Sequence, residues 1–127
     1  MNRFARVSVV LFFLTLMAAC LDKNSNTTIE VIDKAYLTDE VLGKDVQLVD
    51  VRTPEEYEAG HIGDAVNFNI IDSELFLSQI DGLDKEKPVY LYCKMGGRSN
   101  RAAELMKKQG FAKIYDYSGG YNDWVSE

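Results

Sequence analysis

The sequence predicts a single α/β domain built around a mostly parallel β-sheet. Three features lead to this prediction. Short runs of β-branched and aromatic residues alternate with segments of helical periodicity, which is the pattern of strands connected by helices. The length of 127 residues supports one core of ordinary size. The 46% hydrophobic content and the low number of Gly and Pro residues argue against a disordered or collagen-like chain.

Residues 1–19 have the character of a cleaved secretory signal. Arg3 and Arg6 precede an apolar run over residues 7–19 that only Ser8 and Thr15 interrupt. As a helix this run would span only about 20 Å, which is too short for the hydrocarbon core of a bilayer. We therefore expect a signal peptide. A buried core helix and a short membrane anchor are the alternatives.

Cys20 directly follows Met17-Ala18-Ala19, and this segment resembles the lipobox of bacterial lipoproteins. The resemblance implies that Cys20 is lipidated and holds the protein in the cell envelope, on the periplasmic or extracytoplasmic side. Residues 20–28 then form a polar tether, and residues 29–127 form the domain. Ordinary signal cleavage beside an incidental cysteine is the alternative.

The composition limits the partners. With 20 acidic against 14 basic residues and a net charge of -6, the chain is not expected to bind nucleic acid. The same imbalance makes contact with a membrane by charge improbable, so we expect contact through an N-terminal lipid only. Two cysteines and one histidine supply neither a disulfide scaffold nor a zinc site. We expect no metal.

The first half of the domain contains two strand-and-helix units. Residues 46–51 (VQLVDV) read as a buried parallel strand. Thr53 is a helix cap with Pro54 at the first helical position, and Gly60 ends that short helix. Residues 65–69 form a candidate strand, and Asp72-Ser73 begins a helix that runs to residue 80.

The second half begins with the clearest strand, residues 88–92 (PVYLY), in which Pro88 occupies the tolerated first position. A helix over residues 98–109 follows and ends at Gly110. Residues 112–115 form another strand. Gly119-Gly120 makes a tight turn into a last short helix over residues 121–125, where we expect Trp124 to pack on the sheet.

The loop after the PVYLY strand carries the chemistry. Cys93 lies at the carboxyl end of that strand, where open α/β sheets place their ligand sites. Gly96 and Gly97 allow successive backbone N–H groups to turn inward, and a helix N-terminus follows. Lys94 and Arg98 add positive charge. All of these features favour a thiolate, so we expect the pKa of Cys93 to lie below the ~8.5 of a free cysteine. An inert core cysteine is the alternative.

Three motifs together resemble the rhodanese-domain sulfurtransferases. The first is the segment Tyr92-Cys93-Lys94-Met95-Gly96-Gly97-Arg98-Ser99, which is similar to the active-site loop of that family. The second is residues 50–57 (DVRTPEEY) followed by Gly60-His61-Ile62, and the third is residues 119–124 (GGYNDW). Where the family usually has Pro-Gly-Ala after the second motif, this chain has Gly63-Asp64-Ala65. The resemblance implies a rhodanese-like three-layer α/β/α sandwich.

The resemblance also implies a mechanism. Cys93 takes a sulfur from a small anionic donor such as thiosulfate, forms a persulfide, and passes the sulfur to cyanide or a thiol. Lys94, Met95, Gly96, Gly97, Arg98 and Ser99 form the loop that binds donor and persulfide. The family assigns structural roles to Asp50, Arg52, His61, Gly119, Gly120 and Trp124. No cofactor beyond the persulfide is implied, and we expect a monomer.

Several alternatives stay open. Cysteine-dependent phosphatases place five residues between Cys and Arg, whereas four separate Cys93 from Arg98, which disfavours that chemistry. A thiol-redox protein would need a second cysteine at C-x-x-C spacing. The main alternative is a non-enzymatic binding or thiol-sensing module on the same fold. Arg52 could pair with either Asp50 or Glu56.

Overall fold

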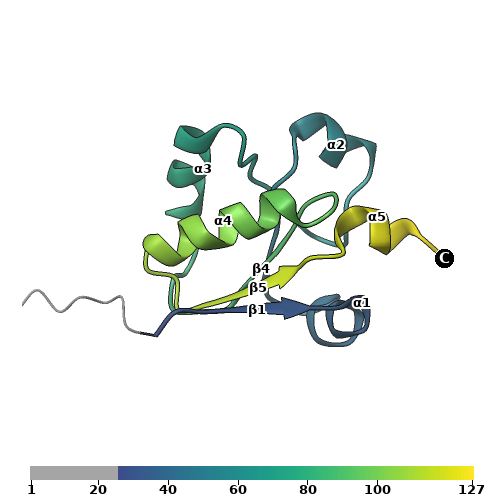
Figure 1. Ribbon diagram of the computed structural model, residues 1–127, viewed down its shortest axis with the longest axis horizontal. Helices are drawn as coiled ribbons and strands as arrows, with labels where there is room; N and C mark the ends of the chain where they lie inside the picture. Colours follow the sequence, from purple (N-terminus) through teal and green to yellow (C-terminus); the bar gives the residue numbers. More distant parts are fainter. Residues whose placement is uncertain (1–25) are drawn as a thin grey trace, which may run out of the picture.

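A computed structural model describes residues 26–127 of the chain (Figure 1). The expected signal peptide, Cys20 and the tether up to residue 25 lie outside the described residues. The sheet begins at the last residue of the expected tether, Thr28, and the neighbouring Thr27 Oγ1 donates a hydrogen bond to Phe111 O at 2.7 Å. Within residues 26–127, no helix has the length and apolar character needed to cross a bilayer.

The strands form one five-stranded sheet in which every pair is parallel. Its spatial order is β1-β5-β4-β2-β3, so β4 lies at the centre. The strands are β1 (Thr28–Ile32), β2 (Gln47–Asp50), β3 (Val66–Asn67), β4 (Val89–Tyr92) and β5 (Lys113–Tyr117). Because all five strands point the same way, their carboxyl ends meet at one edge of the sheet, and the predicted α/β class is confirmed.

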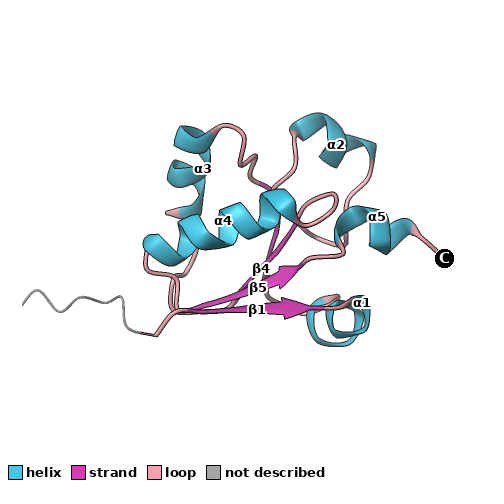
Figure 2. Cartoon of the chain, viewed as in Figure 1, coloured by secondary structure: helices cyan, strands magenta, loops and turns pink. Residues whose placement is uncertain are grey.

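Helical segments cover both faces of the sheet (Figure 2). The helical segments are α1 (Lys34–Tyr36), the π-helical turn η1 (Leu37–Val41), α2 (Pro54–Ala59), α3 (Ser73–Ile80), α4 (Gly97–Lys108) and α5 (Gly120–Val125). One apolar cluster joins α3 and α4 to the first face of the sheet, and a second joins α1, η1 and α5 to the opposite face. Helix α2 buries none of its residues and lies beside the edge formed by the strand ends. The chain is therefore the predicted three-layer sandwich.

The helix ends follow the predicted signals. Thr53 forms a complete capping box with Glu56, and Pro54 stands at the first helical position of α2. Asp72 accepts a hydrogen bond from Leu75 N at 3.2 Å at the start of α3. Gly110, with φ of 89°, ends the α4 segment. Strand β5 runs two residues beyond the predicted end at Tyr115.

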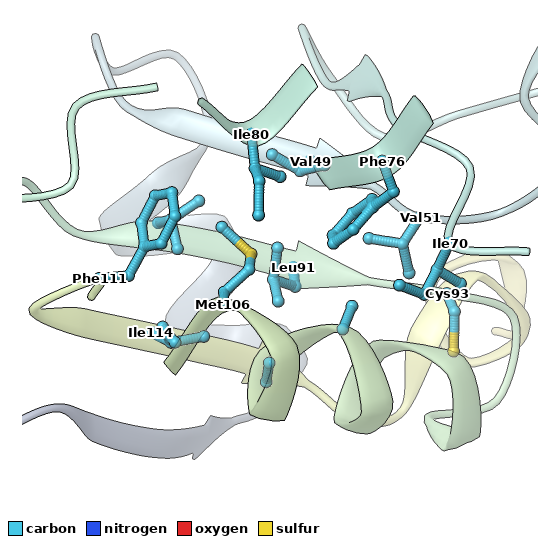
Figure 3. Close-up of a cluster of buried hydrophobic side chains, with 13 residues drawn as sticks. Val49, Val51, Ile70, Phe76, Ile80, Leu91, Cys93, Met106, Phe111 and Ile114 are labelled. Atoms are coloured by element: carbon cyan, nitrogen blue, oxygen red, sulfur yellow. The ribbon is translucent and has the colours of Figure 1, made fainter. Parts of the chain in front are cut away.

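The central strand aims Cys93 at the helix that follows it. Alternate residues of β4 point to opposite faces, so Val89 and Leu91 lie in the α3–α4 cluster whereas Tyr90 and Tyr92 lie in the other. Cys93 continues the alternation and belongs to the first cluster. Figure 3 shows its sulfur directed toward the first turn of α4. The sheet geometry alone therefore brings the thiol to a helix N-terminus.

Candidate active site

The Cys93 side chain lies at the floor of the loop that connects β4 to α4. It is only 1% exposed, and Gly96 N donates a hydrogen bond to Sγ at 3.0 Å. The Ser99 hydroxyl lies 3.5 Å from the same sulfur and donates to Gly96 O at 3.2 Å. The sulfur therefore accepts from the Gly96 N–H, donates to the Ser99 hydroxyl, and lies at the positive end of a helix.

The neighbouring hydrogen-bonding groups change the acidity of the Cys93 thiol. Burial raises the pKa of Cys93, but the side chain of Ser99 and the backbone N–H groups of Ser99, Gly96 and Met95 lower it further than burial raises it. The pKa therefore lies below the ordinary value for cysteine. The groups that lower this pKa are neutral hydrogen-bonding groups close to the sulfur.

Arg98 is engaged elsewhere. Its guanidinium forms two hydrogen bonds with the Glu56 carboxylate of α2, at 2.6 and 2.9 Å. The same carboxylate accepts from Thr53 in the capping box. Hydrogen bonding from Arg98, opposed by burial and aided by the Arg98 charge, lowers the pKa of Glu56 to about 2. Arg98 therefore ties α2 to the start of α4, a contact that the sequence motifs do not reveal.

Lys94 and Met95 form the exposed part of the loop. Met95 is 71% exposed, and Lys94 is exposed as well. Among residues 26–127, no carboxylate lies within ion-pair distance of the Lys94 ammonium. Of the two cations expected in the loop, Lys94 is the one with a charge that is not compensated at short range.

The Gly119-Gly120 turn allows α5 to approach the loop closely. Tyr121 N donates to Cys93 O at 2.8 Å, and Asn122 N donates to Lys94 O at 3.1 Å. Gly120 has φ of +68°, and a Cβ there would lie 2.5 Å from Lys94 O and 2.7 Å from Cys93 O. The turn thus fixes the backbone of Cys93 and Lys94.

A close approach of the backbone also requires glycine at position 96. Its φ is +101°, and a Cβ would lie 2.5 Å from Ser118 O, in the segment just before that turn. A side chain at this position would push the loop away from β5 and would move the N–H that donates to Cys93 Sγ. The neighbouring Gly97 has open space where a Cβ would lie.

A buried ion pair supports the loop from beneath. Arg52 is 3% exposed and Asp50 is fully buried, and they share three side-chain hydrogen bonds of 2.7 to 3.1 Å. Arg52 also donates to Gly60 O at 2.6 Å and lies 4.2 Å from the centre of the Tyr121 ring. Of the two partners considered for Arg52, the structure selects Asp50.

His61 and Trp124 lie away from the sulfur. The His61 ring is exposed and stacks on Tyr57 at 4.0 Å, with Nδ1 3.1 Å from Tyr57 O. Trp124 is half-buried and packs against the apolar cluster on the α5 side of the sheet.

The sequence reasoning missed Glu56 and Asp116 as neighbours of the site. Asp116 is 2% exposed on β5, and burial raises the pKa of its carboxyl more than the nearby Ser99 side chain lowers it. An Asp between Tyr115 and Tyr117 in an otherwise buried run is the signal that could have identified it, because an acidic residue is uncommon there.

Chemically, this arrangement can hold a nucleophilic sulfur and a negative charge on it. The described part of the chain holds no group of three His, Cys, Asp or Glu side chains placed to share a metal ion. Fold and loop together define an α/β protein with a buried cysteine of lowered pKa at the carboxyl end of its central strand.

Comparison with known proteins gives the family. The family model for the rhodanese-like domain matches residues 33–127. Since this match covers most of the chain, the protein belongs to the rhodanese-like domain family.

The sequence relatives include three proteins of differing description. The Bacillus subtilis uncharacterized protein YqhL is 42% identical over 78 residues, which are 61% of this chain and 60% of YqhL. The thiosulfate sulfurtransferase GlpE of Coxiella burnetii is 33% identical over 81 residues, 64% of this chain and 73% of GlpE. The putative sulfur carrier protein YrkF of Bacillus subtilis is 30% identical over 83% of this chain and 55% of YrkF.

Solved structures agree on the fold. A rhodanese-like domain protein from Staphylococcus aureus superposes with a TM-score of 0.67 at 28% identity, covering 77% of this chain and 93% of the other. An uncharacterized protein from Saccharomyces cerevisiae gives 0.66 at 30% identity, covering 77% and 92%.

Proposed function

We propose that this chain is a sulfurtransferase that carries a sulfane sulfur on Cys93. The observation that carries the proposal is the sulfur of Cys93 held by Gly96 N at 3.0 Å and by the Ser99 hydroxyl at the N-terminus of α4. Membership in the rhodanese-like family and the likeness to a thiosulfate sulfurtransferase support the same chemistry.

The reaction has two steps. The Cys93 thiolate attacks the outer sulfur of thiosulfate, a new S–S bond forms, and the old S–S bond breaks so that sulfite leaves with its electron pair. Cyanide or an acceptor thiolate then attacks the outer sulfur of the Cys93 persulfide. With cyanide, thiocyanate leaves and the thiolate is restored. No external oxidant or reductant is needed.

The loop stabilises the negative sulfur in both states. The Gly96 N–H already donates to Sγ, so it needs little reorganisation when the charge moves to the outer sulfur. The backbone N–H groups of Met95 and Ser99, which also lower the pKa of Cys93, favour a negative charge at the same place. No residue has to act as a general base because the low pKa of Cys93 supplies the thiolate.

Lys94 is the residue we assign to attracting the donor anion. Its ammonium is exposed beside the loop, whereas the Arg98 guanidinium is bound to Glu56. Lys94→Gln should therefore raise the KM for thiosulfate while leaving kcat nearly unchanged. Lys108→Gln, an exposed lysine at the far end of α4, is the matched control. Equal KM values for the Lys94 variant and the control would refute this assignment.

The direct test is the intact mass of the protein after incubation with thiosulfate, and again after addition of cyanide. We expect a gain of one sulfur that cyanide removes as thiocyanate, and no gain in Cys93→Ser. If wild type gains no sulfur from thiosulfate or from other persulfide donors, the proposal fails and a binding or thiol-sensing module becomes the better account.

We also propose attachment to the cell envelope through lipid on Cys20. The apolar segment ahead of that cysteine and the lipobox-like Met17-Ala18-Ala19 support it. Metabolic labelling with a radioactive fatty acid, with Cys20→Ala as the control, tests the proposal. Label that persists in the Cys20→Ala protein would refute it.

A further inference from the structure

Asp116 is a buried acid that the proposed mechanism does not use. It lies on β5 between Val31 of β1 and Leu91 of β4, which are its partners in the sheet register. Asp116 is 2% exposed, and its Oδ1 has no hydrogen-bond partner in the described part of the chain. A buried polar atom without a partner is costly and asks for an explanation.

The carboxyl of Asp116 faces the active-site side of the sheet. Successive residues of β5 alternate, and Ile114 belongs to the cluster under α4 whereas Tyr115 and Tyr117 belong to the opposite one. Asp116 therefore shares the face of Cys93 and of the buried Ser99 on α4. The Ser99 side chain lies near enough to affect the pKa of the Asp116 carboxyl, although the structure forms no hydrogen bond between them. Ser99 is itself fully buried and lies 3.5 Å from Cys93 Sγ.

Within residues 26–127, no lysine or arginine forms an ion pair with Asp116. The Arg98 guanidinium of the loop is bound by Glu56, and the buried Arg52 is bound by Asp50. The charged residues Glu30 and Lys113 alternate onto the other face, and the sheet neighbours of Asp116 are apolar. An ionised carboxyl here would be an unpaired buried charge beside a thiolate, which is unfavourable on both counts. Burial raises the pKa of Asp116, and the nearby Ser99 side chain offsets only part of that rise.

A neutral Asp116 would complete the hydrogen bonding of Ser99. A protonated carboxyl can donate to Ser99 Oγ, which leaves the single Ser99 proton free for another acceptor. In the thiol form that proton goes to Gly96 O at 3.2 Å. When the thiol ionises, the proton can turn to Sγ, and Gly96 O keeps a partner because Asn100 N donates to it at 3.1 Å.

We propose that Asp116 is a positioning residue that stays a neutral carboxylic acid and, by donating to Ser99, makes the Ser99 hydroxyl a donor to the Cys93 thiolate. Donation by Ser99 to a Cys93 persulfide would rest on the proposed sulfur transfer. Donation to the thiolate does not rest on it, because it concerns the acidity of Cys93 alone.

The test is the pKa of Cys93 in two variants of the full chain, measured from the ultraviolet absorbance of the thiolate against pH. The same titration of each protein with Cys93→Ser is subtracted, which removes the signal of Cys20 and of tyrosines. Asp116→Asn keeps an N–H donor toward Ser99 and cannot ionise, whereas Asp116→Leu is of similar size and donates nothing. We expect Asp116→Asn to keep the wild-type pKa and Asp116→Leu to raise it by about one unit, as loss of one hydrogen bond does.

Ser99 provides the coupling control. Ser99→Ala should raise the Cys93 pKa, and adding Asp116→Leu to it should raise the pKa no further, since both act through one hydroxyl. A lower Cys93 pKa in Asp116→Asn would mean that wild-type Asp116 is charged and would overturn the proposal, as would an unchanged pKa in Asp116→Leu.

If Asp116→Leu does not fold, infrared spectroscopy decides. A carbonyl band of a protonated carboxylic acid at neutral pH, present in wild type and missing in Asp116→Asn, is the expected result. Its absence in wild type would overturn the proposal. Neither measurement uses a sulfur donor, so a failure of sulfur transfer and a failure of this proposal are distinguishable.

Discussion

Replacing Glu56 by Gln removes the charge that holds Arg98 but keeps an oxygen for the cap of α2. The Gln Oε1 can still accept from Thr53 N and Oγ1, which Glu56 now does at 3.4 and 3.1 Å. The change therefore isolates the ion pair that joins α2 to the first turn of α4.

The size of the effect follows from linkage. The Arg98 hydrogen bonds, opposed by burial and aided by the Arg98 charge, lower the pKa of Glu56 from 4.5 to about 2. At 1.36 kcal/mol per unit, this shift corresponds to about 3 kcal/mol. The two side chains are 25% and 28% exposed, so screening by water reduces the value to about 2 kcal/mol. Because the folded carboxyl binds its proton more weakly than the unfolded one, this stabilisation is fully present above pH 4.5 and is lost as the pH falls toward about 2.

Urea denaturation of wild type and Glu56→Gln measures this free energy of unfolding. We expect the variant to be less stable by about 2 kcal/mol at neutral pH, and the difference to vanish near pH 2. Glu58→Gln, an exposed acid on the same helix, is the control and should resemble wild type. If Glu56→Gln matches Glu58→Gln at neutral pH, or if the difference does not shrink in acid, the reasoning is wrong.

Three further outcomes are expected. Asp50→Asn leaves the Arg52 charge buried and uncompensated, so it should lower the free energy of unfolding by about 3–5 kcal/mol in urea; a loss below about 1 kcal/mol would contradict this. Gly96→Ala should lower the melting temperature because of its positive φ and the facing carbonyl, whereas Gly97→Ala should keep or raise it, and equal effects would refute the geometric argument. His61→Phe keeps the aromatic stacking, so the rate of sulfur loading should fall far less than the ~100-fold cost of losing a general acid or base.

The sequence predicts the second half of the fold and the position of Cys93 well. The central strand and α4 have strong local signals: a buried β-branched and aromatic run, a glycine pair, and a helical apolar spacing. Their connection places Cys93 at a helix N-terminus by chain geometry alone. The family motifs, which are short and local, supply the rest of that prediction.

The first strand and the helical turns after it were not predicted. Strand β1 is five residues long and joins the sheet at its edge, and only its last residue is fully buried. Such a segment has little local hydrophobic pattern, and its place depends on pairing with β5, more than 80 residues away along the chain. Long-range pairing of this kind cannot be seen in a local pattern.

The side-chain pairs of the site could also not be predicted, for the same physical reason. Arg98 looks free in the loop because its partner, Glu56, lies 42 residues earlier on another helix. Acidic residues are rare in buried strands, so the sequence predicts that the strand ends before Asp116. The strand β5 nevertheless continues to Tyr117, and the Asp116 carboxyl is buried. In both cases tertiary packing, which is invisible in the local pattern, decides the role of the charge.

The parallel sheet also determines which end of the domain is attached when the chain is fixed through its N-terminal segment. Thr28 pairs with Lys113, and Ile114 pairs with Val89, so Thr28 is level with the residue before β4. Cys93 lies five residues further along, which at strand rise is about 16 Å toward the opposite edge of the sheet. Anything fixed ahead of Thr28, whether a lipid anchor or an affinity tag on a solid support, is therefore attached at the end away from Cys93. Immobilisation through that end should leave the Cys93 loop turned toward the solution.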